Sequence, residues 1–250
     1  MKASTIFLKV LKGVLIAAVW LGVWYLLALI VGKELFLPYP HIVARRLVEL
    51  SRTVPFWETV GVSLLRILEG FALGTALGFA LAIATHYVRP LRAFFAPAVR
   101  AVRATPVVSF ILLAYLWLDN NTIPVVIALL MVLPIIWENM TAGLESLDPS
   151  LHEMARVYKL PRHRELMKIT LPALAPHFYS GALTSLGLAW KSGIAAEVIS
   201  YPKIAIGKSM NDAKLVLDTA EVLAWTVVVV LLSLSFEWLF KLLFKRRKRK

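Results

Sequence analysis

The sequence predicts an all-α membrane protein with six transmembrane helices and both termini in the cytoplasm. Three observations predict this class: an excess of apolar residues, six long apolar stretches, and an uneven distribution of positive charge. Of the 250 residues, 59% are hydrophobic and 17% are charged, whereas soluble domains are nearer half apolar and a quarter charged. One soluble core of this size cannot bury the excess, so the bilayer is the expected solvent.

Six stretches are long and apolar enough to cross a bilayer, which takes about 20 residues of helix. They cover residues 11–31, 61–85, 98–118, 122–142, 173–199 and 220–244. The lysine-rich segment before the first stretch is typical of a signal peptide. However, this stretch is too long for the apolar part of a signal peptide and ends without a small-residue cleavage site. We therefore expect a retained first span.

The basic residues predict the orientation. Three clusters lie on one side of the membrane if there are six spans, and the positive-inside rule makes that side the cytoplasm. The clusters are Lys2, Lys9 and Lys12; Arg89, Arg92, Arg100 and Arg103; and the run Lys245–Lys250. The last run could indicate nucleic acid, but after a long apolar helix it is better interpreted as a cytoplasmic stop that attracts anionic lipid.

Three parts follow from this organisation. Residues 1–60 hold the first span and an outer segment, residues 61–245 form the main transmembrane domain, and residues 246–250 are a basic cytoplasmic tail. The outer segment places Ile42, Leu47, Val48 and Leu50 among charged residues. This pattern fits a short amphipathic helix on the outer surface as well as it fits an ordered loop.

Small residues form a stripe in the second span. Gly70, Gly74, Gly78 and Ala82 recur every four residues, and this spacing puts them on one helical face. Such a stripe lets another helix approach closely, although a span rich in Gly and Ala can also show it by chance. Pro106, Pro124 and Pro134 are expected to start or kink helices.

The predicted cytoplasmic segment 143–172 has a local structure of its own. Asp148 is a good helix N-cap and Pro149 suits the first helical position. Pro161 ends that helix and can open another. We expect two short helices that project from the membrane as a docking element, since structured loops of about 30 residues commonly have such roles.

The same segment resembles the EAA motif of ABC importer permeases. The family pattern is E-A-A, three residues, Gly, nine residues, Ile, one residue and Leu-Pro. The matching residues here are Glu153-Met154-Ala155, position 159, Ile169, Leu171 and Pro172. Met154 replaces the central Ala, and Lys159 replaces the Gly that bends the chain; Leu160-Pro161 can supply that break instead. The segments 63–117 and 186–200 resemble the nitrate, sulfonate and taurine branch of these permeases.

The resemblance implies a type I ABC importer-like transmembrane domain in the bacterial inner membrane. In such permeases the loop docks into an ATPase subunit and converts its closure into movement of membrane helices. The implied contact consists of Glu153, Met154, Ala155, Tyr158, Lys159, Leu160 and Pro161. The implied partners are two ATPase subunits, a second permease copy and an extracytoplasmic binding protein.

This chain lacks a phosphate-binding G-x-x-x-x-G-K-[ST] loop, so ATP and Mg are expected in the partner and no cofactor in this chain. Nor does it hold a catalytic constellation, so it is not expected to be an enzyme.

Several charges fall inside predicted spans. Lys191 is costly in a bilayer unless it faces protein or water, so it either adds positive potential to a pathway or forms an interhelical ion pair. Glu197, six residues on, is on a different face of the helix and is expected to pair across helices or line the path. The predicted pathway residues are Trp190, Lys191, Ser192 and Glu197. Arg66 and Glu69 can pair on one helix, and a basic loop residue can neutralise Glu138.

The expected function is translocation of a small organic anion, of sulfonate or nitrate type, by an ATP-driven importer. The alternative is a secondary transporter driven by an ion gradient. Such transporters often contain inverted repeats about a midplane site, and no convincing repeat is found in this sequence.

Overall fold

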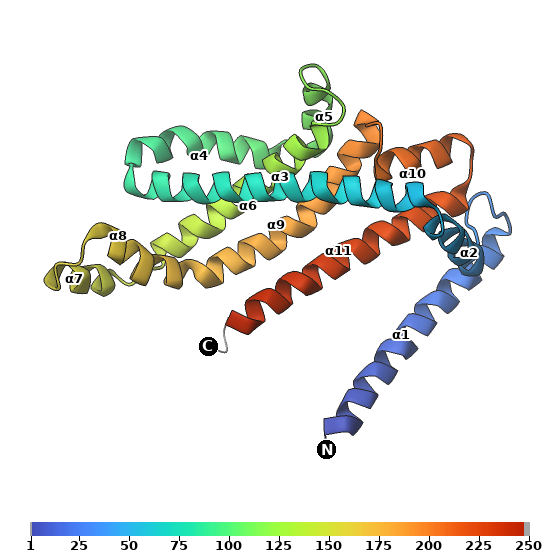
Figure 1. The fold of residues 1–250 in the computed structure, drawn as a ribbon, viewed down its shortest axis with the longest axis horizontal. Coiled ribbons are helices and arrows are strands. Elements are labelled where there is room, and N and C mark those ends of the chain that lie inside the picture. Colours follow the sequence, from blue (N-terminus) through green and yellow to red (C-terminus); the bar gives the residue numbers. More distant parts are fainter. Residues whose placement is uncertain (1, 248–250) are drawn as a thin grey trace. The chain divides into compact units, whose positions relative to one another are not determined.

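The structure is a computed structural model that describes residues 2–247. Within that range it describes all side chains except those of residues 2–10, 149, 151, 152, 162, 243 and 245–247. Most of the predicted basic tail therefore lies outside the described residues. The helices (Figure 1) are α1 (Lys2–Val31), α2 (Pro40–Ser51), α3 (Val54–Tyr87), α4 (Arg89–Ala104), α5 (Val107–Tyr115), α6 (Ile123–Glu145), α7 (Pro149–Val157), α8 (Arg162–Glu165), the π-helix η1 (Leu166–Thr170), α9 (Leu171–Ser200), α10 (Ile206–Leu215) and α11 (Thr219–Arg247).

Among the described residues, four helices have the length and composition of membrane spans: Leu11–Val31, Val54–Tyr87, Ile123–Glu145 and Thr219–Leu242. The predicted span 98–118 is wrong as a single straight helix. It is divided between α4 and α5, which are bent by 100° at a short break and would raise the number of spans to five if they cross together. Pro106 causes the break, because a proline disfavours the helical conformation of the residue before it. The predicted span 173–199 is the helix α9, but α9 is not among the candidates by composition.

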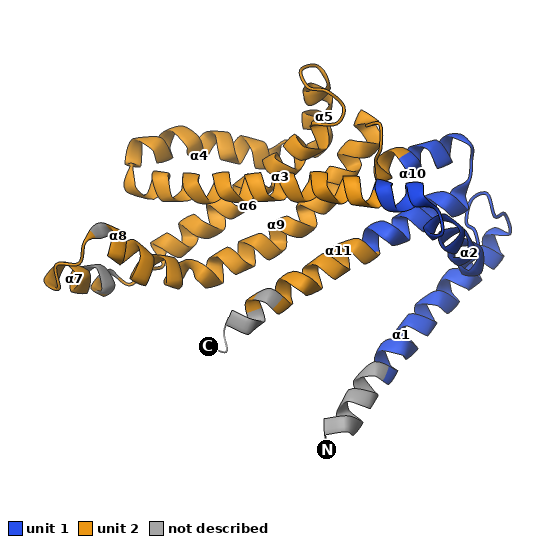
Figure 2. Ribbon diagram, in the orientation of Figure 1, with its two compact units in different colours: residues 1–59, 209–230 blue, residues 60–208, 231–250 orange. Residues whose placement is uncertain are grey.

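The chain divides into two compact units, which Figure 2 colours separately. Unit 1 comprises residues 1–59 and 209–230, and unit 2 comprises residues 60–208 and 231–250. In unit 1, α2 is a helix from Pro40 to Ser51, which excludes the loop alternative for this outer segment. The proline at its start suits the first helical position, where the backbone N–H has no helical partner.

The helix α6 is the centre of unit 2. It packs along α9 and also contacts α4 and α5. Apolar side chains from α5, α6 and α9 form a buried cluster at one end, made of Ile111, Ala114, Ile123, Ile127 and Ala196. Pro124 lies in the first turn of α6, as expected, and Pro134 is accommodated within the helix.

The glycine stripe packs α3 directly against the backbone of α6. A Cβ atom built on Gly70 would lie 2.4 Å from the Val125 carbonyl oxygen, and one on Gly74 would lie 2.8 Å from that of Leu129. At Gly78 the corresponding distance to the Leu133 carbonyl oxygen is 2.7 Å. These distances leave no room for a side chain, so the predicted close helix approach is confirmed.

Candidate transport and coupling sites

A buried carboxylate, Glu197, is the centre of a polar network in unit 2. Its side chain is fully buried in α9. Oε2 accepts hydrogen bonds from the Ser63 hydroxyl at 2.9 Å and from the Gly207 backbone N–H at 3.1 Å. Oε1 accepts one from the Arg66 guanidinium at 3.2 Å. Glu197 therefore joins three helices, since these donors lie on α3 and in the first turn of α10.

Gly207 makes this arrangement sterically possible. A Cβ atom on it would lie 2.5 Å from the Cβ of Glu197 and 2.5 Å from the Val198 backbone nitrogen. Because position 207 has no side chain, the start of α10 reaches the carboxylate directly. Helix N-termini carry unpaired N–H groups and a partial positive charge, and both favour an anion there. The adjacent N–H of Ile206 donates to the Ser63 hydroxyl at 2.8 Å, which completes the contact.

Arg66 extends the network to two loops. Its guanidinium donates to the Ile204 carbonyl oxygen at 3.0 Å and to the Asn121 side-chain oxygen at 3.3 Å, besides Glu197. The expected pairing of Arg66 with Glu69 is therefore replaced by an interhelical one. A charge buried away from water gains most from a buried opposite charge, and Glu197 supplies it. The pairing of Glu197 across helices is confirmed.

The other predicted pathway residues lie on different faces of α9. Trp190 and Ser192 are buried: the Trp190 ring stacks on that of Phe236, with centroids 6.2 Å apart, and the Ser192 hydroxyl donates to the Leu188 carbonyl oxygen at 2.8 Å. Lys191 is exposed. The structure thus brings Trp190, Ser192 and Glu197 into the helix bundle, and it leaves Lys191 on the surface of the single chain.

The predicted docking segment contains the expected first helix, α7. The Asp148 carboxylate caps it by accepting the Ser150 backbone N–H at 2.9 Å. This hydrogen bond lowers the pKa of Asp148, so the cap stays ionised at neutral pH. Ala155 is buried, whereas Glu153, Met154, Tyr158, Lys159 and Pro161 are exposed and Leu160 is half-buried. The exposed face thus offers a carboxylate beside apolar groups to a partner.

The bend after α7 occurs at Lys159 itself, and not at Leu160-Pro161 as expected. Lys159 has a φ of 48°, in the left-handed region. The Leu160 N–H donates to the Ala155 carbonyl oxygen at 2.9 Å, a bond that closes helices ending in this conformation. Glycine adopts it without steric cost, which explains the family's glycine at this position. Here a lysine bears the strain.

The second helix of the docking segment is continuous with α9. Backbone angles stay helical through Glu165, Thr170 and Leu171, so α8, η1 and α9 form one rod with a π-helical turn inside it. The expectation of two short separate helices is thus half wrong. Because α9 also carries Glu197, one continuous helical path leads from α8 to the buried network.

Two ion pairs join α4 to α6. Arg92 lies 2.5 Å from a Glu145 oxygen, and Arg103 pairs with Glu138. The second pair confirms the expected neutralisation of Glu138 by a basic residue. The segment that carries these arginines, predicted as a loop and the start of the third span, is instead the helix α4.

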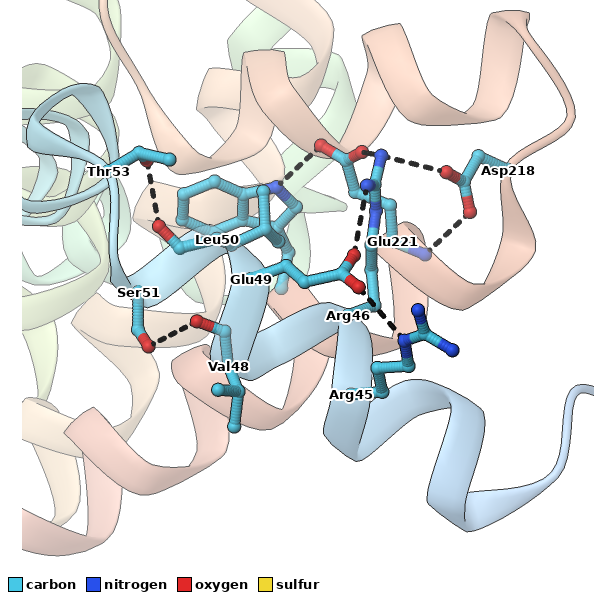
Figure 3. A network of polar contacts seen from close by, with 10 residues as sticks. Arg45, Arg46, Val48, Glu49, Leu50, Ser51, Thr53, Asp218 and Glu221 are labelled. Atoms are coloured by element: carbon cyan, nitrogen blue, oxygen red, sulfur yellow. Dashed lines mark hydrogen bonds and ion pairs between the residues drawn. The ribbon is translucent and has the colours of Figure 1, made fainter.

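Unit 1 has its own polar network, drawn in Figure 3. Arg46 of α2 contacts Glu221 at 2.6 Å and Asp218 at 3.1 Å, at the start of α11. Burial is the largest influence on the pKa of Arg46 and lowers it, but the hydrogen bond to Glu221 and the charges of Glu221, Asp218 and Glu49 together raise it. The indole N–H of Trp225 donates to Glu221 at 3.3 Å. These contacts fasten α2 to α11.

Sequence reasoning missed three participants in the Glu197 network: Ser63, Asn121 and Gly207. Ser63 and Arg66 are three residues apart on one helix, but nothing along the chain pairs them with position 197. Of these three residues, only Gly207 had a feature in the sequence that could have revealed it. It is a glycine at the start of a helix, between Ile206 and Lys208. Among the described residues no group of three His, Asp or Glu side chains is arranged to hold a metal ion.

Among the described residues, the fold is helical, with four helices of membrane-spanning length and a segment after α7 that is continuous with α9. The family of binding-protein-dependent transport system inner membrane components matches residues 74–249. The chain belongs to this family, and it is the permease subunit of an ABC importer.

Known relatives agree with this assignment. A Bacillus subtilis protein described as an aliphatic sulfonates transport permease, SsuC, is 27% identical over 87% of this chain and 79% of its own. The taurine transport system permease TauC of Escherichia coli is 25% identical, over 88% of this chain and 82% of its own. The bicarbonate transport system permease CmpB of Synechococcus elongatus is 28% identical, over 63% and 57%.

Two solved structures share the fold. An amino acid ABC transporter crystallised with histidines matches with a TM-score of 0.65, over 80% of this chain and 97% of its own, at 17% identity. The methionine ABC transporter MetNI, in inward-facing conformations, matches with a TM-score of 0.57 over 77% and 92%, at 16% identity.

Proposed function

We propose that this chain translocates a small organic anion, such as a sulfonate, in an ATP-driven importer to which an extracytoplasmic binding protein delivers the solute. The observation that supports this proposal most strongly is the continuous helical connection from the exposed docking segment to the buried Glu197 network. A secondary transporter has no need for such a lever. The family supports the importer, and the sulfonate, taurine and bicarbonate named for its relatives support an anion.

The membrane arrangement that fits this function has six crossings and cytoplasmic termini. They are α1, α3, the α4–α5 pair, α6, α9 and α11. α9 has 30 residues, so it is long enough to cross, and Ser185, Ser192 and Glu197 are buried within the bundle. The family assignment and the arginines of α4 support this arrangement, since the positive-inside rule favours the cytoplasm for the side on which these arginines lie.

The docking segment is proposed to engage an ATPase subunit. Glu153, Met154 and Tyr158 are exposed on α7 or at its end, and exposed apolar residues rimmed by charge are typical of interaction sites. One chain supplies one such segment, so an importer with two ATPase subunits needs two permease copies. ATP and Mg would be bound by the ATPase subunits.

Within the membrane, Lys191 and Glu197 are proposed to have different roles. Lys191 is exposed on α9, and an exposed cation within a span is favourable where it faces water or protein. We place it on the translocation route, where its charge attracts an anion. Glu197 is a positioning residue: through Gly207 and Arg66 it holds the segment from Ile204 to Gly207, and α9 connects it to the docking helix. Trp190 and Ser192 support the adjacent turn of α9.

The experiment is ATP-dependent uptake by the permease co-expressed with its ATPase subunit and binding protein in membrane vesicles. Labelled taurine, ethanesulfonate and bicarbonate are the probes. Uptake that needs internal ATP and survives an uncoupler is the expected result, whereas uptake abolished by the uncoupler alone would establish the ion-gradient alternative.

A charge reversal tests the coupling contact. Glu153→Lys is expected to reduce co-purification of the ATPase subunit and to abolish uptake, because it inverts the charge of the docking face. Lys168→Glu, at a position of the same segment that the motif leaves unspecified, is the control and should retain both. Equal behaviour of the two variants would contradict the assigned contact.

A further inference from the structure

The arginines of α4 form a stripe on one face of the helix. At about 100° per residue, Arg89, Arg92, Arg100 and Arg103 fall within about 80° of one another. No acidic residue occurs in α4. Val99 is the buried side chain next to this stripe, while Phe94, on another side of the helix, is 73% exposed. The helix therefore has one strongly cationic side.

Only half of this stripe is neutralised. Arg92 and Arg103 pair with Glu145 and Glu138 of α6. Among the described residues no carboxylate pairs with Arg89 or Arg100, and the Arg100 side chain donates only to the Ala96 carbonyl oxygen, at 3.3 Å. The two paired arginines lie at the edge of the stripe nearer Val99, and the two others lie farther round the helix. A positive strip beside α6 is thus left uncompensated.

The uncompensated charge extends inward along a membrane-spanning helix. Glu138 lies seven residues before the end of α6 at Glu145, which is about 10 Å along the axis. Arg100 is one turn before Arg103, so it lies between the levels of Glu145 and Glu138, within the last turns of α6. An arginine beside a spanning helix is unfavourable against lipid and is usually turned to a water-filled route or to protein.

We propose that Arg100, with Arg89 nearer the cytoplasm, forms an anion-binding step in the inner half of the translocation pathway; this rests on the proposed function. A guanidinium binds the oxygens of a sulfonate or carboxylate in a planar, bidentate manner. Neutralisation of Arg92 and Arg103 keeps this binding weak enough for release, as conduction requires. Arg100 then acts on the same anion that Lys191 attracts, at a separate point of the route.

The absence of cysteine from the chain makes local charge directly measurable. Ala96→Cys places a thiol between Arg92 and Arg100, and Ala98→Cys places one at nearly the same level on the other side of α4. The two cysteine variants are prepared in inside-out vesicles that hold the complete transporter. Each variant is treated separately with an anionic reagent, sulfonatoethyl methanethiosulfonate, and with its cationic trimethylammonium counterpart. The ratio of the two reaction rates reports the local potential.

At Ala96→Cys we expect the anionic reagent to react roughly tenfold faster, because a cationic cleft concentrates anions by this order. Adding Arg100→Gln should remove most of the preference, whereas Arg100→Lys should keep it. Ethanesulfonate should slow the anionic reaction. Ala98→Cys should show no such preference with either residue at position 100.

Two results would overturn the inference: equal rates of the two reagents at Ala96→Cys, or a preference that Arg100→Gln leaves unchanged. A preference that appears only in vesicles without phosphatidylglycerol would mean that anionic lipid headgroups occupy Arg100, and it would also overturn the inference. ATP-dependent release of labelled ethanesulfonate, loaded with the binding protein inside the same inside-out vesicles, separates these failures from a failure of the proposed function.

Discussion

Arg66 of α3 donates a hydrogen bond to Glu197 of α9 over 3.2 Å, and the acceptor carboxylate is fully buried. This pair connects α3 and α9 at the point where α10 begins. Since Ser63 and the Gly207 N–H saturate the other carboxylate oxygen, the charge is both paired and hydrogen-bonded. A buried ion is stable only when both conditions are met.

Removal of Arg66 is expected to destabilise unit 2. Arg66→Ala leaves Glu197 buried without its counter-charge, which costs about 3–5 kcal/mol for a buried pair. Thermal unfolding of the solubilised protein measures the loss. Combining Arg66→Ala with Glu197→Gln should restore part of the stability, because the amide needs no counter-charge. Additive losses in the double variant would mean that the two residues do not interact.

Gly207 is expected to tolerate no side chain. In Gly207→Ala the new methyl group would overlap Glu197 and the backbone nitrogen of Val198, so α10 must shift and release its N–H from the carboxylate. We expect a loss of about 1–3 kcal/mol, the usual range for overpacking. Gly187→Ala in α9 is the control, as its Cβ would meet nothing within 4 Å. Similar melting temperatures for the two variants would refute this account.

The contact between α3 and α6 gives a second pair of glycine variants within one helix. Gly74→Ala would place a methyl group 2.8 Å from the Leu129 carbonyl oxygen, forcing the helices apart at a cost of about 1–3 kcal/mol. Gly61→Ala meets nothing within 4 Å and should gain up to about 1 kcal/mol from helix propensity. Opposite shifts in thermal stability are the expected signature, and shifts of the same sign would disprove the close packing.

Lys159 is expected to be a strained hinge. Lys159→Gly relieves the left-handed conformation, which costs a residue with a side chain about 1–2 kcal/mol. The amide protons of α7 should therefore exchange more slowly with deuterium. Tyr158→Gly, at a φ of −80°, is the matched control and should accelerate exchange instead. Faster exchange in Lys159→Gly would show that the bend is not strained.

A further variant separates the backbone of Lys159 from its charge. Lys159→Ala keeps the strain but removes the ammonium group. If the side chain contacts the ATPase subunit, both Lys159→Gly and Lys159→Ala should weaken co-purification. If only the bend matters, Lys159→Gly should retain the ATPase at least as well as the natural chain.

Sequence pattern alone predicted most of the helices and the docking segment. Hydrophobic length locates α1, α3, α6 and α11, because the bilayer demands about 20 apolar residues in any fold. Local rules were sufficient for the Asp148 cap and for the glycine stripe of α3, since each depends on residues within one or two turns. The family resemblance, carried by Glu153 to Pro172, supplied the class of transporter.

The tertiary structure alone decided which charges meet. Glu197 selects Arg66, Ser63 and Gly207, which are separated from it by up to 134 residues, and no periodicity along the chain encodes such a pairing. The same is true of the left-handed Lys159, where neighbouring packing overrides a local preference. The break between α4 and α5, by contrast, follows locally from Pro106, although its angle of 100° is known only from the structure. Patterns of apolar residues determine which segments become helices, because solvent acts on each segment separately. The partners of a buried charge depend on the whole bundle, because only the packing of several helices removes that charge from water.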